Sequence, residues 1–142
     1  MYFISKKFKV AIGHRLLDHP GKCGSFHGHN FIIEIQVSST VLNKHNMIID
    51  FSELEEIVEV ELEALDHAAL LNRKDNMLEA FKQYNQKIQL IGEGDPTAEA
   101  LSYYLFYQLK DAFLYLKIKL EEVKVWENDS SMACYREDQW RL

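Results

Sequence analysis

The stretch HGHNFIIEIQVSSTV, residues 27–41, decides the fold class of this chain. Its apolar residues alternate with residues of the other face, which is the period of a half-buried β-strand. They are Phe31, Ile33, Ile35 and Val37. Residues 2–12 also carry a strand pattern, and a loop containing glycine and proline follows them. The chain is therefore predicted to open with two consecutive strands.

A long helix is predicted after these strands. DFSELEEIVEVELEALDH, residues 50–67, places its apolar residues along one helical stripe. Ser52 is followed three residues later by Glu55, which matches a capping box, so the helix is expected to begin there. Beyond it, residues 76–84 predict a short helix and residues 87–91 a small strand. We interpret these two pieces as a small insert.

A second long helix is expected to open at DPTAEA, residues 95–100. Asp95 can cap this helix, and Pro96 suits its first turn, where no N–H is required. KIKLEEVKVWE (117–127) and MACYRED (132–138) then predict two strands joined by the turn-forming NDSS. The chain therefore ends, as it begins, with a pair of strands.

The element order β-β-α-(small insert)-α-β-β predicts an α+β fold. We expect a four-stranded antiparallel sheet with the two long helices on one face. The chain has 142 residues and no Gly/Ser-rich linker or internal repeat, so residues 1–142 are expected to form a single domain.

Charge and composition narrow the possible partners. The net charge is −6, and no basic cluster exceeds the Lys6–Lys7 pair, which argues against a non-specific nucleic-acid binder. No apolar run approaches the length of a membrane span, and the N-terminus lacks the apolar core of a signal peptide. The two cysteines, Cys23 and Cys134, are expected to be thiols in the cytoplasm.

Three histidines form a candidate metal site. His27 and His29 are separated by Gly28 on one predicted strand, so both imidazoles face the same side. His14 lies at the end of the preceding strand, which can bring it alongside. Three neutral imidazoles suit zinc and leave a fourth position for water or substrate. The alternative is that these histidines make ordinary hydrogen bonds at the surface or in the core.

Cys23, four residues before His27, permits three interpretations. As a fourth ligand it would close the site and make the zinc structural. As a free thiol beside a metal it can act as a base or nucleophile. It can also be a small buried residue without chemistry. Local spacing does not choose among them.

Two acidic motifs complete the set of candidates. Asp66 and His67 end the first long helix, where a carboxylate can orient an imidazole for acid–base work. Contact between these neighbours requires the helix to have ended, and otherwise they are an exposed pair. Glu127, at the end of VKVWE, can accept two N–H donors from a guanidine-like heterocycle edge, or is simply a solvated strand end.

Together these pieces resemble the 6-pyruvoyltetrahydropterin synthase / 6-carboxytetrahydropterin synthase family across nearly the whole chain. The matching landmarks, in the family's order, are GHRL, CGSFHGHNF, MIIDFSEL, LDHAALLN, DPTAEAL and VKVWEND. The three-residue gap between the cysteine and HGH is similar to the bacterial enzymes of queuosine biosynthesis, whereas animal pyruvoyl enzymes have a longer gap. The segment 73–94 is longer than in the compact queuosine enzymes.

The resemblance implies a role for each matching residue. The implied zinc ligands are His14, His27 and His29. The implied proton-transfer residues are Cys23 as base with Asp66 and His67 as its partners. The implied substrate-binding residues are Glu127, which anchors the pterin ring, with Thr97 and Glu99 beside the pterin pocket.

The resemblance also implies a fold, an assembly and a reaction. The family has the tunnelling fold (T-fold) and forms homo-hexamers with active sites at subunit interfaces. Its substrate is 7,8-dihydroneopterin triphosphate, and the leading expectation is the zinc-dependent synthesis of 6-carboxytetrahydropterin. Two related reactions remain open: 6-pyruvoyltetrahydropterin synthesis and side-chain cleavage for folate. From another class, a non-catalytic zinc- or pterin-binding protein remains open, with Cys23 closing the metal site.

Overall fold

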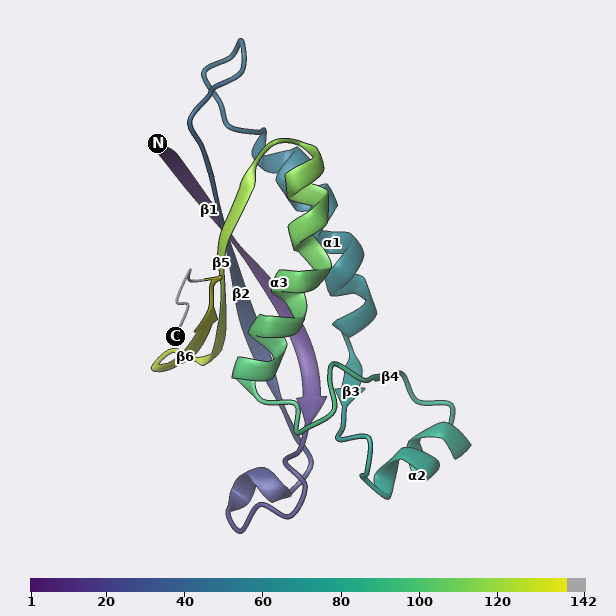
Figure 1. Ribbon diagram of the computed structural model, residues 1–142. Coiled ribbons are helices and arrows are strands. Elements are labelled where there is room, and N and C mark those ends of the chain that lie inside the picture. Colours follow the sequence, from purple (N-terminus) through teal and green to yellow (C-terminus); the bar gives the residue numbers. More distant parts are fainter. Residues whose placement is uncertain (138–142) are drawn as a thin grey trace.

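The computed structural model describes residues 1–137 of the chain (Figure 1). The elements follow in the order β1 (Tyr2–His14), η1 (Lys22–Gly24), β2 (His27–Ser39), α1 (Phe51–Leu65), β3 (Ala68–Leu70), α2 (Met77–Gln83), β4 (Ile88–Gln89), α3 (Ala98–Tyr115), β5 (Lys119–Asn128) and β6 (Ser131–Tyr135). This order confirms the predicted α+β class and the position of the insert. Of the predicted last strand, Asp138 lies outside the described residues.

The sheet has six strands in the order β4-β3-β1-β2-β5-β6. The pairs β1–β2, β2–β5 and β5–β6 are antiparallel, whereas β1–β3 and β3–β4 are parallel. The prediction of a four-stranded antiparallel sheet is therefore wrong in strand number and in direction. The cause is the run Ala68–Leu70, which follows α1 after Asp66 and His67 and is too short to show a strand period. Through β3, the small strand β4 also joins the sheet. The small strand predicted at residues 87–91 is confirmed as β4.

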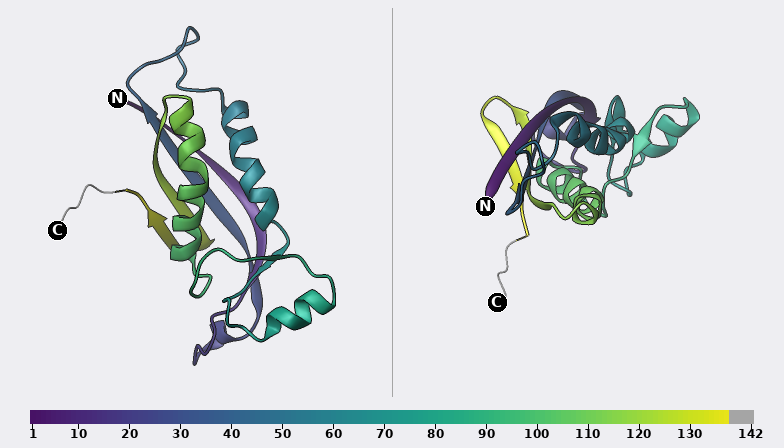
Figure 2. Two further views of the ribbon diagram at one scale, coloured as in Figure 1. Left: turned by 45° about the vertical axis from the view of Figure 1, so that its right-hand side comes forward. Right: turned by 90° about the horizontal axis from the view of Figure 1, so that it is seen from above.

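The two long helices, α1 and α3, lie side by side against one face of the sheet (Figures 1 and 2). The alternating residues of β2 all point into this layer, where each is at most 1% exposed. They pack in one cluster with Leu54 and Val58 of α1 and with Leu101 and Leu105 of α3. Burial of such a side chain contributes roughly 1.5–3 kcal/mol. Within the described residues, no helix combines the length and apolarity that a bilayer crossing requires.

The start of α1 differs from the prediction by one residue. The helix begins at Phe51, and its cap is Asp50, whose carboxylate Oδ1 accepts from the Ser52 amide at 2.8 Å. Glu53 completes a capping box by accepting from the Asp50 amide at 3.3 Å. The predicted cap at Ser52 is wrong because an aspartate two residues earlier takes that role.

The start of α3 also differs from the prediction. Thr97 caps this helix by accepting from the Ala100 amide at 3.2 Å, and Ala98 is its first residue. The predicted cap, Asp95, uses its Oδ1 instead to accept from the Leu17 amide and from Asn72. Asp95 therefore ties three separate segments together rather than beginning a helix.

The insert has its own small hydrophobic cluster and a firm attachment to β1. α2 confirms the short helix predicted there, and Leu78 of α2 packs with Leu71. Arg15 donates to both carboxylate oxygens of Asp75, at 2.6 and 2.7 Å, and the Asp75 side chain is wholly buried. The bonds from Arg15 lower the pKa of Asp75. This ion pair fixes the insert beside the end of β1.

Candidate functional site

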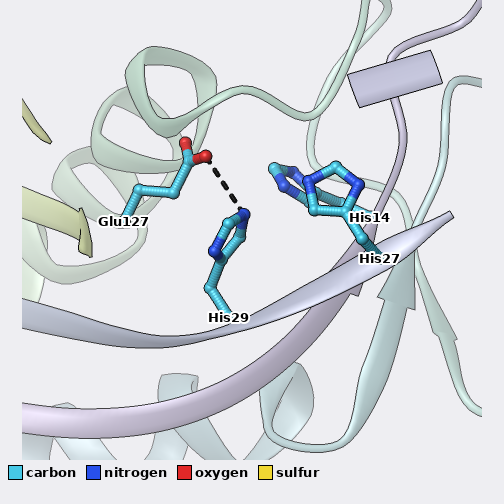
Figure 3. Close-up of side chains that lie close together, drawn as sticks. All are labelled: His14, His27, His29 and Glu127. Carbon is cyan, nitrogen blue, oxygen red and sulfur yellow. Dashed lines mark ion pairs between the residues drawn. The ribbon is translucent and has the colours of Figure 1, made fainter. Parts of the chain in front are cut away.

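The pairing of β1 with β2 brings three histidines to one face of the sheet (Figure 3). His14 lies opposite His27, and His29 lies opposite Ile12, which is buried beneath the helices. The ring centroid of His14 lies 4.6 Å from that of His27 and 5.2 Å from that of His29. The ring centroids of His27 and His29 are 4.9 Å apart. The three imidazoles therefore lie close together, as predicted.

Glu127 joins this group from β5, the strand next to β2. Its Oε1 lies 3.0 Å from Nε2 of His29 (Figure 3). One ligand atom from each of four residues lies within 4.8 Å of the others. They are His14, His27, His29 and Glu127, which we call the His/Glu cluster.

Two of the imidazoles are oriented by backbone carbonyls. Nδ1 of His14 lies 2.8 Å from the carbonyl of Pro96, and Nδ1 of His27 lies 2.7 Å from that of Ser25. A carbonyl oxygen only accepts, so in each ring Nδ1 is the donor, and the neutral form of this tautomer has its lone pair on Nε2. This is the arrangement by which proteins present histidine to a metal ion.

The cluster also contains nitrogen atoms that need a partner. Nε2 of His14 and of His29 are buried, and neither has a hydrogen-bond partner among the described residues. The carboxylate of Glu127 is close to His29 but does not form a well-directed hydrogen bond with it. Since buried polar atoms are normally paired, a metal ion fits this position.

The electrostatics of the cluster favour metal binding. Burial lowers the pKa of His14, so this imidazole is neutral and able to coordinate near neutral pH. Three imidazoles with one carboxylate form a donor set that suits zinc and several neighbouring transition metals. The His/Glu cluster can therefore bind a metal ion.

Cys23 lies outside the His/Glu cluster. It belongs to the short helix η1, between β1 and β2, and is partly buried. Both Cys23 and Cys134 are free, as predicted. The interpretation in which Cys23 closes the metal site as a fourth ligand therefore finds no support in this arrangement.

Asp66 and His67 contact each other directly after α1 has ended. Asp66 is the C-cap, and His67 has a positive φ of 59°. Oδ2 of Asp66 lies 2.7 Å from Nδ1 of His67, while Oδ1 accepts from the Ala11 amide at 3.0 Å. That amide is the main reason that the pKa of Asp66 is lowered. The pair, which we call the Asp–His dyad, thus has the form expected for acid–base work.

The Asp–His dyad is separated from the His/Glu cluster by the sheet. His67 donates its amide to Ala11, whose side chain points away from the face that carries Ile12 and the cluster. There His67 borders a hollow of about 430 Å³ together with Phe26 and Phe81. The His67 side chain is 79% exposed. Within one chain, the two sets of candidate residues therefore lie on opposite faces.

The remaining predicted residues lie at the start of α3. Thr97 follows Pro96, whose carbonyl contacts His14, so Thr97 is close to the cluster along the chain. Glu99 lies in the first turn of α3 and is exposed. Sequence patterns missed the supporting contacts from Pro96 and Ser25. Backbone carbonyls leave no residue-type signal, so no pattern would have found them.

The chain has relatives along almost its whole length. Residues 3–138 match the family model described as 6-pyruvoyl tetrahydropterin synthase. The 6-carboxy-5,6,7,8-tetrahydropterin synthase of Haemophilus influenzae is 31% identical, covering 96% of this chain and 100% of that protein. The protein of the same name from Aquifex aeolicus is 28% identical, covering 95% of this chain and 98% of that protein.

Solved structures share the fold. An uncharacterised protein from Wolinella succinogenes superposes with a TM-score of 0.81 at 19% identity, over 96% of this chain and 98% of that one. The 6-pyruvoyl tetrahydropterin synthase of Caenorhabditis elegans superposes with a TM-score of 0.72 at 21% identity, over 96% of each chain. With the family match, these comparisons show that the chain belongs to the 6-pyruvoyl tetrahydropterin synthase family, whose members are lyases.

Proposed function

We propose that this chain is a zinc-dependent 6-carboxy-5,6,7,8-tetrahydropterin synthase. It would convert 7,8-dihydroneopterin triphosphate and one water molecule into 6-carboxytetrahydropterin, acetaldehyde and triphosphate, as a step of queuosine biosynthesis. The observation that carries the proposal is the nearly full-length similarity to the Haemophilus influenzae enzyme of that name. The His/Glu cluster and the Asp–His dyad supply groups that such a reaction requires.

In this proposal His14, His27 and His29 hold zinc through their Nε2 atoms. The orientation of two of these rings by carbonyls and the lack of other partners for the buried Nε2 atoms support this assignment. When bound, zinc would act as a Lewis acid toward the hydroxyls of the substrate side chain.

Cys23 would serve as the base that removes a proton from the substrate side chain. Its position outside the His/Glu cluster leaves the thiol available for that task. Asp66 would hold His67 with its proton on Nδ1, so that Nε2 can accept a proton and pass it on. The positive φ of His67, which costs roughly 1–3 kcal/mol, is consistent with a residue held in place for chemistry.

Glu127 would anchor the pterin through the amino-pyrimidine edge, with Thr97 and Glu99 beside it. The carboxylate lies at the border of the cluster, so a pterin bound to it would have its side chain next to the metal. The Thr97 hydroxyl already accepts from the Ala100 amide, and it keeps its own O–H to donate.

A homo-oligomer, which we propose to be a hexamer, would bring the Asp–His dyad of one copy to the cluster of the next. The dyad is largely exposed, and His67 donates its amide to Ala11, whose side chain points away from the face of Ile12 and the cluster. β3 pairs with β1 only from Ile12 to His14, so much of that edge of β1 is open among the described residues. Association between copies is one way in which proteins cover such edges. The free cysteines fit an enzyme of the cytoplasm.

Product analysis tests the proposal directly. The purified protein, loaded with zinc, is incubated with 7,8-dihydroneopterin triphosphate, and the products are identified by mass. Release of acetaldehyde with a 6-carboxypterin is the expected result. A 6-pyruvoyl product would identify the related synthase instead, and a pterin with a shortened side chain the folate-pathway reaction. Absence of turnover with zinc fully bound would favour a binding protein.

A further inference from the structure

Asp95 holds together the three segments that surround His14. Its Oδ1 accepts from the Leu17 amide, three residues after His14, at 3.0 Å. The same oxygen accepts from Nδ2 of Asn72 at 2.8 Å. Asn72 lies two residues after Leu70, the partner of His14 in the β1–β3 pair. One carboxylate oxygen therefore fixes the chain just beyond His14 to the chain just beyond β3.

The backbone that follows Asp95 reaches the His14 ring. Pro96 is buried, and its carbonyl accepts from Nδ1 of His14 at 2.8 Å. The Thr97 amide bonds the Asp95 carbonyl at 2.9 Å, and Thr97 then starts α3. Because the proline ring fixes φ, the Pro96 carbonyl has little freedom once its two neighbours are held.

We propose that Asp95 is a positioning residue for the metal site, which holds the Pro96 carbonyl against Nδ1 of His14 and so aims Nε2 of His14 into the His/Glu cluster. This inference rests on the metal site of the proposed function. Asp95 touches neither metal nor substrate, and it acts through the orientation and tautomer of one imidazole. Partners of this kind typically change metal affinity 10- to 100-fold when removed.

A second contact near His14, the ion pair of Arg15 with Asp75, does not orient the His14 ring. Arg15, next to His14, is held by Asp75, but that pair acts on the side chain of Arg15 and lies at the start of the insert. Asp95 differs because it directly precedes the carbonyl that contacts the imidazole. Its loss therefore leaves the ring without a defined partner even where β1 keeps its place.

The chain offers a matched control for this test. Oδ1 of Asp50 also accepts two hydrogen bonds, from the amide of Ser52 at 2.8 Å and from its hydroxyl at 2.6 Å. Asp50→Ala therefore also removes a carboxylate that accepts several hydrogen bonds, at the start of α1 and without contact to the cluster. Asp95→Asn is the conservative variant, because its amide oxygen can accept both bonds that Oδ1 of Asp95 accepts.

Two measurements decide the proposal. The first is zinc affinity, from competition of the full chain with a chromophoric chelator. The second is the Nδ1 proton of His14 in the metal-free protein, observed by NMR with labelled histidine. Asp95→Ala is expected to weaken zinc binding about tenfold or more and to lose the protected Nδ1 proton. Asp95→Asn is expected to keep both, and Asp50→Ala to lower the melting temperature while keeping both.

Other outcomes separate this inference from the proposed function. If Asp95→Ala keeps the Nδ1 proton of His14 and binds zinc within twofold of wild type, the positioning role is wrong. If the wild-type chain binds no zinc, the proposed function fails, and the Nδ1 proton in Asp95→Ala still decides whether Asp95 positions His14. Should Asp95→Ala not fold, Asn72→Ala removes one of the two bonds and is expected to reduce zinc affinity by a smaller factor; unchanged affinity and an unchanged Nδ1 proton would contradict the proposal.

Discussion

The His/Glu cluster and the Asp–His dyad differ in almost every physical respect. His14 of the cluster is 3% exposed, and the other three residues are partly buried. The four residues of the cluster come together within one chain. The dyad lies on the open face, and its histidine is 79% exposed. A set of donors that converges within one chain can bind a metal without a partner, whereas an exposed imidazole is surrounded by water, which weakens its electrostatic control over a reaction.

Under the proposed function, a single chain would hold a complete set of metal ligands and an incomplete set of proton-transfer groups. The dyad gains a defined environment only when another surface covers it.

The largest effect is expected from His27→Ala. Removing one of three imidazoles should reduce zinc affinity by more than about a hundredfold, because even the loss of an indirect partner costs 10- to 100-fold. Turnover should fall to that of the metal-free protein. Metal content by elemental analysis and product formation are the measurements. His45→Ala, which changes an exposed loop histidine, is the control and should keep both. Full zinc occupancy in His27→Ala would refute the ligand role.

Cys23→Ala should separate metal binding from chemistry. Since Cys23 lies outside the cluster, we expect zinc content to stay at the wild-type level. Loss of the base should reduce turnover by about a thousandfold, within the range typical of proton-transfer groups. The matched control is Cys134→Ala on β6, which should behave as wild type. If zinc is lost together with Cys23, the thiol is a ligand after all.

The dyad can be tested by mixing two inactive variants. His67→Ala should keep its zinc and lose about a hundredfold in turnover. Its mixture with His27→Ala, after dissociation and reassembly, should regain activity, since some sites then combine an intact cluster with an intact dyad from another copy. The readout is turnover of the mixture against that of each variant alone. No gain in mixtures shown to exchange subunits would mean that the dyad serves its own chain or none.

A smaller effect, on stability, is expected from Asp75→Ala. The variant leaves Arg15 without its buried partner, and the unfolding free energy should fall by about 2 kcal/mol. Since Arg15 lowers the pKa of Asp75, the pair stabilises the fold above the usual aspartate pKa of about 4. That contribution is lost as pH falls through the lowered pKa of Asp75. The unfolding free energies of wild type and variant should therefore become similar in acid.

Urea unfolding at neutral and acidic pH measures this difference. Glu79→Ala, which removes an exposed ion pair of α2, is the control and should have no measurable effect. If the difference in unfolding free energy between wild type and Asp75→Ala is the same at all pH values, the ion pair is not the source of the stabilisation.

Much of the fold was predictable because long, regular patterns determine it. The alternation in β2 and the helical stripe of α1 extend over many residues, and both elements are present. β3 was missed because three apolar residues have no measurable period, and a parallel partner in β1 is not visible in local sequence. The caps were misplaced because several polar residues near each helix start can serve, and tertiary contacts choose among them.

The site was predictable to the extent that it follows from strand geometry. The alternation of His27 and His29 correctly indicated one face, and His14 joined them through the pairing of β1 with β2. The contact between Glu127 and His29 depends on which strand lies next to β2, which the sequence pattern does not state. The separation of His67 from the cluster depends likewise on the unpredicted strand β3.

The pairing of His14 with His27 also has a consequence for the order in which the molecule assembles. All three imidazoles belong to the hairpin β1–β2, whereas Glu127 lies on β5 and reaches them only after α3 has been made. Contacts between residues that are near in sequence form sooner than contacts between residues that are far apart in sequence. We therefore expect the imidazoles to come together early, on the growing chain. The hairpin can then bind a metal ion, and the bound ion can help β5, which carries Glu127, to pair beside β2.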